Sequence, residues 1–243
     1  MTSIAAPEAV LFDLDGTLVD TAPDLATATN VLRRHHGLVP LPFEVIRGQV
    51  SNGGSALVTL ALGLAADHPD HGAARTILLD AYEQALATHS RVFAPLDTWL
   101  DDWHREKRPW GIVTNKPRRY AAPLVEILGL QPGALLCADD LPTKKPAPEP
   151  LWEAARQLNT TPKACWYVGD HVRDMEAARA AGMTAVAVGY GYIAEEEDYR
   201  QWPADVWFDD CAALVDALGG GKARMTAGAA ATGAAAGRRL SRR

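Results

Sequence analysis

The sequence predicts an α/β fold, a Rossmann-like doubly wound parallel sheet core with a helical cap domain inserted after the first strand. Three features of the chain support this prediction. An apolar run at residues 10–12 ends in Asp13, as a strand buried on both faces does. Residues 19–90 carry helical patterns with no convincing strand between them. From about residue 97, strand and helix patterns alternate, which is typical of parallel sheets with right-handed crossovers.

The segment after the opening strand begins with helix-start residues. Thr21, Pro23 and Asp24 precede apolar residues at helical spacing, and Gly37 follows the end of this helix. Further helices are expected at about 42–48, 55–62 and 70–88. We therefore expect a helical cap domain at 19–91 and a core domain formed by 8–18 together with 92–218.

The second half of the chain supplies the rest of the sheet. Short apolar runs predict its strands, and amphipathic stretches that end before glycine or a polar turn predict its helices. The expected strands are 110–114, 134–138, 164–169 and 184–188, with a weaker one at 205–208. The expected helices are 96–107, 118–128, 149–158 and 172–181, with a last one that ends at 218.

Composition and charge restrict the class of protein. The chain has 243 residues, 48% of them hydrophobic, and no apolar stretch that approaches a membrane span. The N-terminus has no secretory signal pattern, and the cysteines, Cys137, Cys165 and Cys211, have no disulfide or zinc spacing. We expect a cytoplasmic protein with reduced thiols, no membrane partner, and an oligomeric state, monomer or homodimer, that the sequence leaves open.

The basic residues are distributed unevenly. Residues 219–243 form a basic, low-complexity tail that we expect to be disordered, with six Lys and Arg and no acid. The rest of the chain has 18 Lys and Arg against 30 Asp and Glu. An acidic body argues against a nucleic-acid partner, and it requires that a phosphate group be met by a locally built positive site.

Polar residues follow each predicted strand, at the edge of the sheet where ligands bind in open parallel sheets. They are Asp13 and Asp15, then Thr114, Asn115 and Lys116, then Asp139, Asp140, Lys144 and Lys145, and finally Asp170 and Asp174. In an extended segment Asp13 and Asp15 would lie on the same side, and Gly16 lets the chain turn after them. By spacing alone these two acids could also be an ordinary turn cluster.

The residue types at this edge suit phosphoryl transfer. Carboxylates from two strands, Asp13 and Asp170, suit Mg²⁺, a hard cation that prefers oxygen ligands. The Thr114 hydroxyl, the Asn115 amide and the Lys145 ammonium suit a phosphoryl group. An aspartate can act as nucleophile, and a second acid two residues later can protonate the leaving group and then activate water.

Four motifs in order resemble those of the haloacid dehalogenase superfamily over about residues 8–218. They are Phe12-Asp13-Leu14-Asp15-Gly16-Thr17-Leu18, Val113-Thr114-Asn115-Lys116-Pro117, Lys145-Pro146-Ala147-Pro148, and Val168-Gly169-Asp170 followed by Asp174. Thr-Asn-Lys-Pro together with Tyr190-Gly191-Tyr192 is similar to the phosphoglycolate phosphatase branch, which includes phosphatases of N-acetylmuramic acid 6-phosphate. The segments 89–93 and 202–205 look somewhat closer to the latter.

The resemblance implies a role for each matched residue. Asp13 is the nucleophile and a metal ligand, and Asp15 is the general acid/base that also offers its backbone carbonyl to the metal. Thr114 and Lys145 bind phosphate, and Asp170 binds Mg²⁺. Asp174 supports the metal or anchors Lys145, although it could also be a helix first-turn acid favoured by the dipole. In the cap, Arg47, Asn52 and Gly53 could contact the substrate, and His171 departs from the residue type usual in the family.

The resemblance implies a Mg²⁺-dependent phosphatase that hydrolyses a small phosphorylated metabolite of the 2-phosphoglycolate or N-acetylmuramic acid 6-phosphate type through an aspartyl phosphate. A phosphomutase on the same scaffold would keep every motif. A phospho-acceptor signalling module is the alternative of another class, but receiver domains are roughly half this length and lack the second aspartate and the inserted helices.

Overall fold

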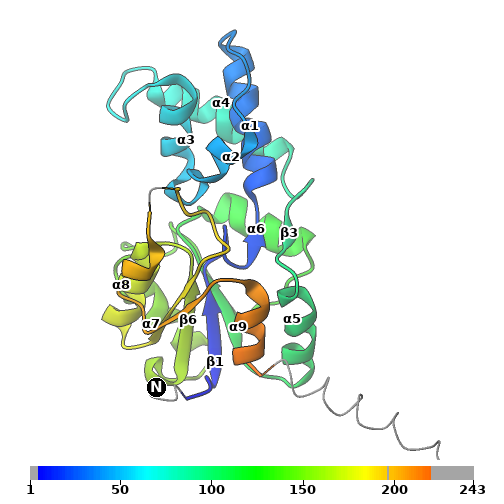
Figure 1. Ribbon diagram of the computed structural model, residues 1–243, viewed down its shortest axis with the longest axis vertical. Helices are drawn as coiled ribbons and strands as arrows, with labels where there is room; N and C mark the ends of the chain where they lie inside the picture. Colours follow the sequence, from blue (N-terminus) through cyan, green and yellow to red (C-terminus); the bar gives the residue numbers. More distant parts are fainter. Residues whose placement is uncertain (1–4, 196, 220–243) are drawn as a thin grey trace, which may run out of the picture.

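A parallel sheet of six strands forms the centre of the computed structural model, which describes residues 5–195 and 197–219 (Figure 1). The sheet order is β5-β4-β1-β6-β7-β8. The strands are β1 (Ala9–Phe12), β4 (Trp110–Val113), β5 (Ala134–Leu136), β6 (Cys165–Gly169), β7 (Thr184–Val188) and β8 (Val206–Phe208). β1 pairs in parallel with both β4 and β6, so Phe12 lies between Ile112 and Val168. The predicted sheet is therefore confirmed.

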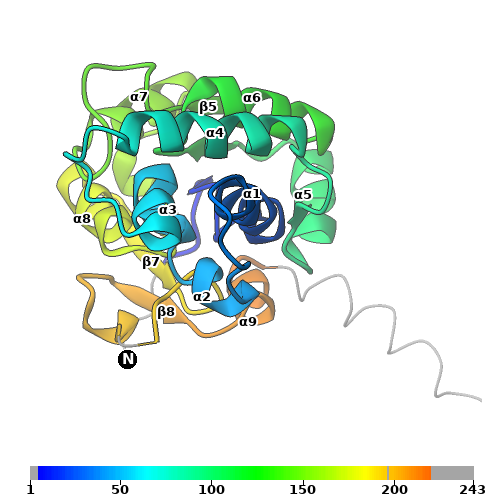
Figure 2. The same cartoon turned by 90° about the horizontal axis from the view of Figure 1, so that it is seen from above.

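Helices cover both faces of the sheet. Val10 and Phe12 pack in one buried cluster with α5 (Leu96–Arg105), α6 (Arg118–Ile127) and α9 (Cys211–Ala217). Ala9 and Leu11 pack in a second cluster with α7 (Glu149–Gln157) and α8 (Val172–Ala181). Successive side chains of a strand point to opposite faces, so the apolar run of β1 supplies both layers. In Figure 2, α5 and α8 lie on opposite sides of the sheet.

Four helices stand beyond the carboxyl end of β1, at the top of Figure 1. They are α1 (Ala22–His35), α2 (Phe43–Arg47), α3 (Gly53–Leu62) and α4 (His71–Gln84), with the short 3₁₀ helix η1 (Val50–Asn52) before α3. We call these segments the cap helices. They enclose a hydrophobic cluster of their own that includes Leu32, Leu57 and Leu78, and Tyr120 and Tyr192 join it from the sheet side. The cap bounds 19–91 and the core bounds 8–18 and 92–218 stay predictions.

The prediction of helices alone between 19 and 90 was wrong at one point. β2 (Val19–Asp20) pairs in antiparallel fashion with β3 (Arg91–Val92). The segment that leads into the cap helices is thus hydrogen-bonded to the segment that leads out of them. Strands of two residues are too short to show an alternating apolar pattern, so the sequence gives no signal for them.

Helix ends differ from the predicted ones by a few residues. α4 ends at Gln84 rather than 88, because the chain turns at Ala87, where φ is 59°, and its backbone then bonds to another helix. The buried carboxylate of Asp24 on α1 accepts hydrogen bonds from the N–H groups of His89 (2.9 Å) and Ser90 (3.0 Å). Two short 3₁₀ segments, η2 (Pro162–Ala164) and η3 (Tyr199–Gln201), complete the described elements.

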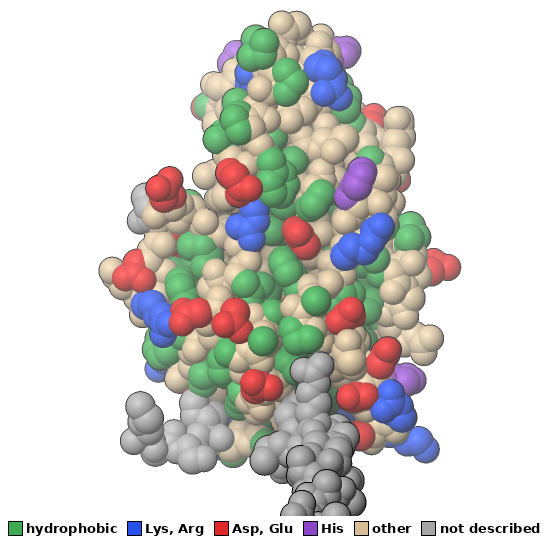
Figure 3. All heavy atoms as spheres, turned by 45° about the vertical axis from the view of Figure 1, so that its right-hand side comes forward, with side chains coloured by type: hydrophobic (Ala, Val, Ile, Leu, Met, Phe, Trp, Pro, Cys, Tyr) green, Lys and Arg blue, Asp and Glu red, His purple; other side chains and the backbone are tan. Residues whose placement is uncertain are grey.

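The surface carries charges of both signs. On the face in Figure 3, basic and acidic side chains are mixed with apolar ones. No helix among the described residues is long and apolar enough to cross a membrane. The basic tail predicted for 219–243 lies outside the described residues, apart from Gly219. The absence of a nucleic-acid partner stays a prediction.

Candidate active site

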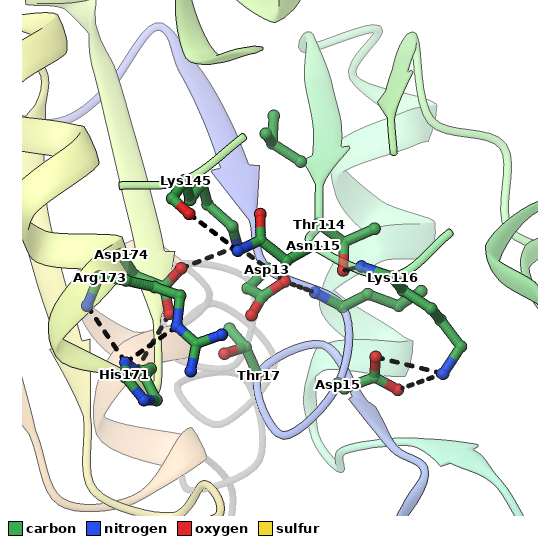
Figure 4. A network of polar contacts seen from close by, with 12 residues as sticks. Asp13, Asp15, Thr17, Thr114, Asn115, Lys116, Lys145, His171, Arg173 and Asp174 are labelled. Carbon is green, nitrogen blue, oxygen red and sulfur yellow. Dashed lines mark hydrogen bonds and ion pairs between the residues drawn. The ribbon is translucent and has the colours of Figure 1, made fainter. Parts of the chain in front are cut away.

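A cavity of about 300 Å³ lies between the cap helices and the carboxyl edge of the sheet. Its walls come from both parts: Asp13, Asp15, Thr114 and Asn115 from the sheet loops, and Asn52, Gly53 and the helix α4 from the cap side. The loops after β1 and β4 thus meet at one cavity, whereas Lys145, Asp170 and Asp174 do not line it. Figure 4 shows Asp13, Asp15, Thr114 and Asn115 with their polar partners, among them the buried Lys145 and Asp174.

Asp13 directly follows β1 and faces the ammonium group of Lys145. The Lys145 Nζ atom lies 2.9 Å from Asp13 Oδ1 and 2.8 Å from Asp174 Oδ1 (Figure 4). It also donates to the hydroxyl of Tyr167 at 2.7 Å. Burial alone would lower the pKa of Lys145, but the two carboxylates outweigh it and raise the pKa, so the ammonium stays charged. Of the two adjacent lysines, Lys145 is buried here, and Lys144 is exposed.

Three carboxylates converge beside this lysine. Asp13, Asp170 and Asp174 each offer an oxygen atom, and these atoms all lie within 4.8 Å of one another. Burial raises the pKa of Asp170 to about 7, and the negative charges of Asp13 and Asp174 add to the effect. Burial also raises the pKa of Asp13. The cluster has more negative charge than one lysine balances, and oxygen ligands suit a hard divalent cation, so these residues fit Mg²⁺.

Asp170 is held from several directions. Its Oδ1 accepts from the Thr17 hydroxyl at 2.9 Å, and its Oδ2 accepts from the Ser51 hydroxyl and the Tyr192 N–H, each at 2.9 Å. Gly16 makes room for it: a Cβ at Gly16, where φ is 80°, would lie 2.2 Å from Asp170 Oδ2. This glycine is therefore required for the turn and for the close approach of the Asp170 side chain.

Asp174 is both an acid in the first turn of a helix and a partner of Lys145. It belongs to the first turn of α8, and its Oδ2 accepts from the His171 N–H at 3.1 Å in a capping box. Its Oδ1 pairs with Lys145. The His171 ring accepts in turn from the Arg173 N–H at 3.2 Å, and burial lowers the pKa of His171 to about 4, so the ring is a neutral helix cap.

Asp15 lies in the turn after Asp13 and has different partners. Lys116 Nζ lies 2.9 Å from Asp15 Oδ1 and 3.2 Å from Oδ2, and the Thr21 hydroxyl donates to Oδ1 at 2.6 Å. Burial would lower the pKa of Lys116, but the charge of Asp15 outweighs it and raises the pKa. Both aspartates line the cavity, so they act on one space while each is paired with its own lysine.

Thr114 and Asn115 follow β4 at the same edge. Thr114 is buried, and its hydroxyl accepts from the Lys116 N–H at 3.2 Å. The Asn115 Nδ2 group donates to the backbone carbonyl of Lys145 at 2.9 Å, which ties the two loops together. Both residues line the cavity together with Asp13.

The three cap residues named from the sequence are placed differently. Asn52 and Gly53 line the cavity, and Asn52 Oδ1 lies 3.3 Å from the Nε2 atom of His171. Arg47 lies elsewhere, because its guanidinium donates to the Tyr190 carbonyl at 2.9 Å and stands over the ring of Tyr192. Its substrate contact stays a prediction that this geometry does not favour.

Sequence reasoning gave no role to several residues that shape this site. Lys116 stands in the Thr-Asn-Lys-Pro motif, so a signal was present, but its pairing with Asp15 depends on the fold. Ser51 and Tyr82 come from the cap helices, and Thr17 is part of the first motif. Neither Ser51 nor Tyr82 stands in a motif, because their role arises only when the cap helices meet the sheet.

The comparisons with known proteins agree with this geometry. The model of the haloacid dehalogenase-like hydrolase family matches residues 7–182. N-acetylmuramic acid 6-phosphate phosphatase of Pseudomonas aeruginosa is 41% identical over 213 residues, which is 87% of this chain and 94% of that protein. Phosphoglycolate phosphatase of Xanthomonas campestris is 38% identical over 205 residues, covering 82% and 91% of the two chains.

A solved structure shows the same architecture. The crystal structure of a predicted phosphoglycolate phosphatase from Haemophilus somnus has a TM-score of 0.76 and 26% identity, and the match covers 88% of this chain and 99% of that one. The family model spans the motifs that carry Asp13, Thr114, Lys145 and Asp170. This chain belongs to the haloacid dehalogenase-like hydrolase family.

Proposed function

We propose that this protein is a Mg²⁺-dependent phosphatase that hydrolyses a small phosphate monoester through an aspartyl phosphate on Asp13. The observation that carries the proposal is the position of Asp13, which lines the cavity, pairs with Lys145 and shares one carboxylate cluster with Asp170 and Asp174. The names of the similar proteins point to phosphatases whose substrates carry both a phosphate and a carboxylate.

In the first step, an Asp13 carboxylate oxygen attacks phosphorus and the bond from phosphorus to the ester oxygen breaks. Asp15 gives its proton to the leaving oxygen. In the second step, Asp15 takes a proton from water, the water oxygen attacks phosphorus, and the bond to Asp13 breaks to release inorganic phosphate. Asp13 is then free for the next cycle.

The other residues hold and balance charge. Lys145 and the Thr114 hydroxyl bind phosphoryl oxygens, and Lys116 holds Asp15 in place through its ion pair. Asp13, Asp170 and Asp174 are the residues that would hold Mg²⁺, with the Asp15 carbonyl as the ligand implied by the family. Bound Mg²⁺ supplies stabilisation of the charge on the transferring phosphoryl group.

The test measures inorganic phosphate released from phosphate monoesters in the presence of Mg²⁺, after treatment with EDTA, and after Mg²⁺ is added back. We expect release with Mg²⁺, its loss on chelation and its recovery on addition. Asp13→Asn should lower release by at least about 10³-fold, because no other group can form the covalent intermediate. Activity that survives chelation, or near-normal turnover by Asp13→Asn, would contradict the proposal, and sugar-phosphate isomers without free phosphate would indicate a phosphomutase.

A further inference from the structure

The segment Tyr190-Gly191-Tyr192, which follows β7, has no role in the proposed reaction, yet it lies against the carboxylate cluster. The Tyr192 N–H donates to Asp170 Oδ2 at 2.9 Å, and the Tyr190 hydroxyl donates to the Thr17 carbonyl at 2.9 Å. A Cβ at Gly191 would lie 2.2 Å from the Cβ of Asp170, so the backbone of this loop packs directly on the aspartate. The 190–192 loop is therefore fixed to the sheet side of the site.

The Tyr192 hydroxyl extends from this loop to the start of α1, the first cap helix. It accepts from the N–H groups of Thr21 at 2.6 Å and Ala22 at 2.9 Å, and it donates to Asp20 Oδ1 at 2.6 Å. Burial raises the pKa of Tyr192 well above its ordinary value, so the hydroxyl keeps its proton. A phenol hydroxyl donates once and accepts twice, so one side chain with its capacity fully used holds three successive residues at the entrance to the cap helices.

This arrangement changes what the Thr21 hydroxyl does. Thr21 is the N-cap residue of α1, where a threonine hydroxyl ordinarily accepts from a backbone N–H of the first helical turn. Among the described residues the Thr21 hydroxyl caps no N–H group, and it donates instead to Asp15 Oδ1 at 2.6 Å. The N–H groups at a helix start need an acceptor, and the Tyr192 oxygen supplies it. Because Tyr192 caps the helix, Thr21 is left to hold Asp15.

We propose that Tyr192 is a positioning residue for the proton transfers assigned to Asp15, an inference that rests on the phosphatase function proposed above. Its hydroxyl fixes the backbone of Thr21, and the Thr21 hydroxyl together with Lys116 fixes the Asp15 carboxyl group, which lines the cavity. The Tyr192 N–H holds Asp170, so one residue fixes the acid/base and the carboxylate cluster relative to each other. Without the Tyr192 hydroxyl, two N–H groups lose their acceptor, the Thr21 hydroxyl is drawn back to cap α1, and Asp15 loses a partner.

The leaving group of the substrate provides the test. An alkyl ester, 2-phosphoglycolate or N-acetylmuramic acid 6-phosphate, whichever the unmodified protein hydrolyses faster, needs a proton from Asp15 on its leaving oxygen, whereas p-nitrophenolate leaves without one. The value of kcat/KM covers the reaction up to release of this first product. The ratio of kcat/KM for the alkyl ester to kcat/KM for p-nitrophenyl phosphate, both measured with Mg²⁺, therefore reports how well the acid is placed, and a loss of folded protein cancels from it.

Tyr192→Phe removes only the hydroxyl, and we expect it to lower this ratio by at least about tenfold. Thr21→Val should lower the ratio to a similar extent, whereas Thr21→Ser keeps a hydroxyl and should stay within about threefold of the unmodified protein. Tyr192→Phe combined with Thr21→Val should lower the ratio no further than the larger single effect, since both changes act through one contact. Tyr199→Phe is the matched control: it removes a hydroxyl that pairs with Asp209 outside the cavity lining and should leave the ratio unchanged.

Asp20→Ala tests the same hydroxyl if Tyr192→Phe does not fold. It removes the acceptor that orients the Tyr192 O–H, so it should lower the ratio by at least about threefold. Equal losses on both kinds of ester in Tyr192→Phe, or an unchanged ratio in Thr21→Val or Asp20→Ala, would overturn the positioning role and leave the phosphatase function intact. No phosphate release from any of the three esters by the unmodified protein would overturn both.

Discussion

At the scale of single residues, the two aspartates of the opening motif differ in their partners. Asp13 pairs with Lys145 at 2.9 Å, whereas Asp15 pairs with Lys116 at 2.9 Å. In the proposed reaction Asp15 is the acid of the first step and the base of the second. Asp15→Asn should therefore slow phosphate release by about 10²–10⁴-fold, and with p-nitrophenyl phosphate, whose leaving oxygen needs no proton, phosphorylated Asp13 should accumulate.

Intact-protein mass spectrometry after rapid mixing with substrate measures this accumulation as the added mass of one phosphoryl group. The double variant Asp13→Asn with Asp15→Asn is the control, since it has no acceptor and should show no added mass. Slow turnover by Asp15→Asn with the unmodified mass throughout, for every substrate that the unmodified protein hydrolyses, would contradict the assignment of water activation to Asp15.

Lys116 is one of the residues whose role emerged only from the structure. Its ammonium contacts both oxygens of Asp15 and lies 4.5 Å from the centre of the Tyr82 ring. Lys116→Met should lower kcat by about 10- to 100-fold, because Asp15 loses the partner that fixes its position, while Lys116→Arg recovers part of the loss. Steady-state kinetics on both variants separates the effects on kcat and KM, and a change confined to KM would show that Lys116 only binds substrate.

At the scale of elements, the buried carboxylate of Asp24 links α1, where the chain enters the cap helices, to the segment before β3, where it leaves them. Asp24, on the first turn of α1, accepts from the His89 N–H, the Ser90 N–H and the Ser90 hydroxyl, the last at 2.6 Å. Asp24→Ala leaves these donors buried without partners, so the free energy of unfolding should fall by about 3 kcal/mol. That corresponds to a drop of roughly 6–12 °C in the thermal midpoint for a chain of this size.

Differential scanning calorimetry checks this value against Asp216→Ala, a change at an exposed aspartate of α9 that should alter the midpoint by less than about 2 °C. A midpoint for Asp24→Ala that matches the control would mean that the hydrogen bonds between α1 and the segment before β3 contribute little to stability.

Most elements could be predicted from the sequence because each carries a local signal. β1 shows as an apolar run before Asp13, and α8 shows as a helix that ends at Gly182. β2 and β3 escaped prediction because two residues cannot display a period. The end of α4 also escaped, because an alanine such as Ala87 gives no sequence signal for the positive φ of 59° at which the chain turns.

The residues of the candidate site also differ in whether the sequence could identify them. Asp13, Lys145, Asp170 and Asp174 were named because each stands in a motif at a strand end, and the structure brings them within ion-pair distance or into one carboxylate cluster. The cap side of the cavity carries no such motif. Ser51 and Tyr82 join the site only because the fold brings the cap helices against the sheet edge.

At the scale of the whole molecule, the cavity is a composite of two separately packed parts. The sheet side carries the groups proposed for phosphoryl transfer, and the cap helices supply the facing wall through Asn52, Gly53 and α4. Ser51 links them, because its hydroxyl donates to Asp170 at 2.9 Å from the cap side. Binding at the carboxylate cluster should therefore influence the stability of both parts.

The last prediction concerns this coupling. Asp13, Asp170 and Asp174 repel one another in a buried place, and Mg²⁺ would relieve the repulsion only in the folded chain, where the three oxygens converge. Mg²⁺ at about 100 times its dissociation constant should add about 2.7 kcal/mol to the free energy of unfolding and raise the thermal midpoint by several degrees. Asp170→Asn should lose most of this shift, whereas Asp139→Asn, outside the cluster, should keep it. Calorimetry with and without Mg²⁺ measures the shift independently of activity, and an equal shift in both variants would place the metal elsewhere.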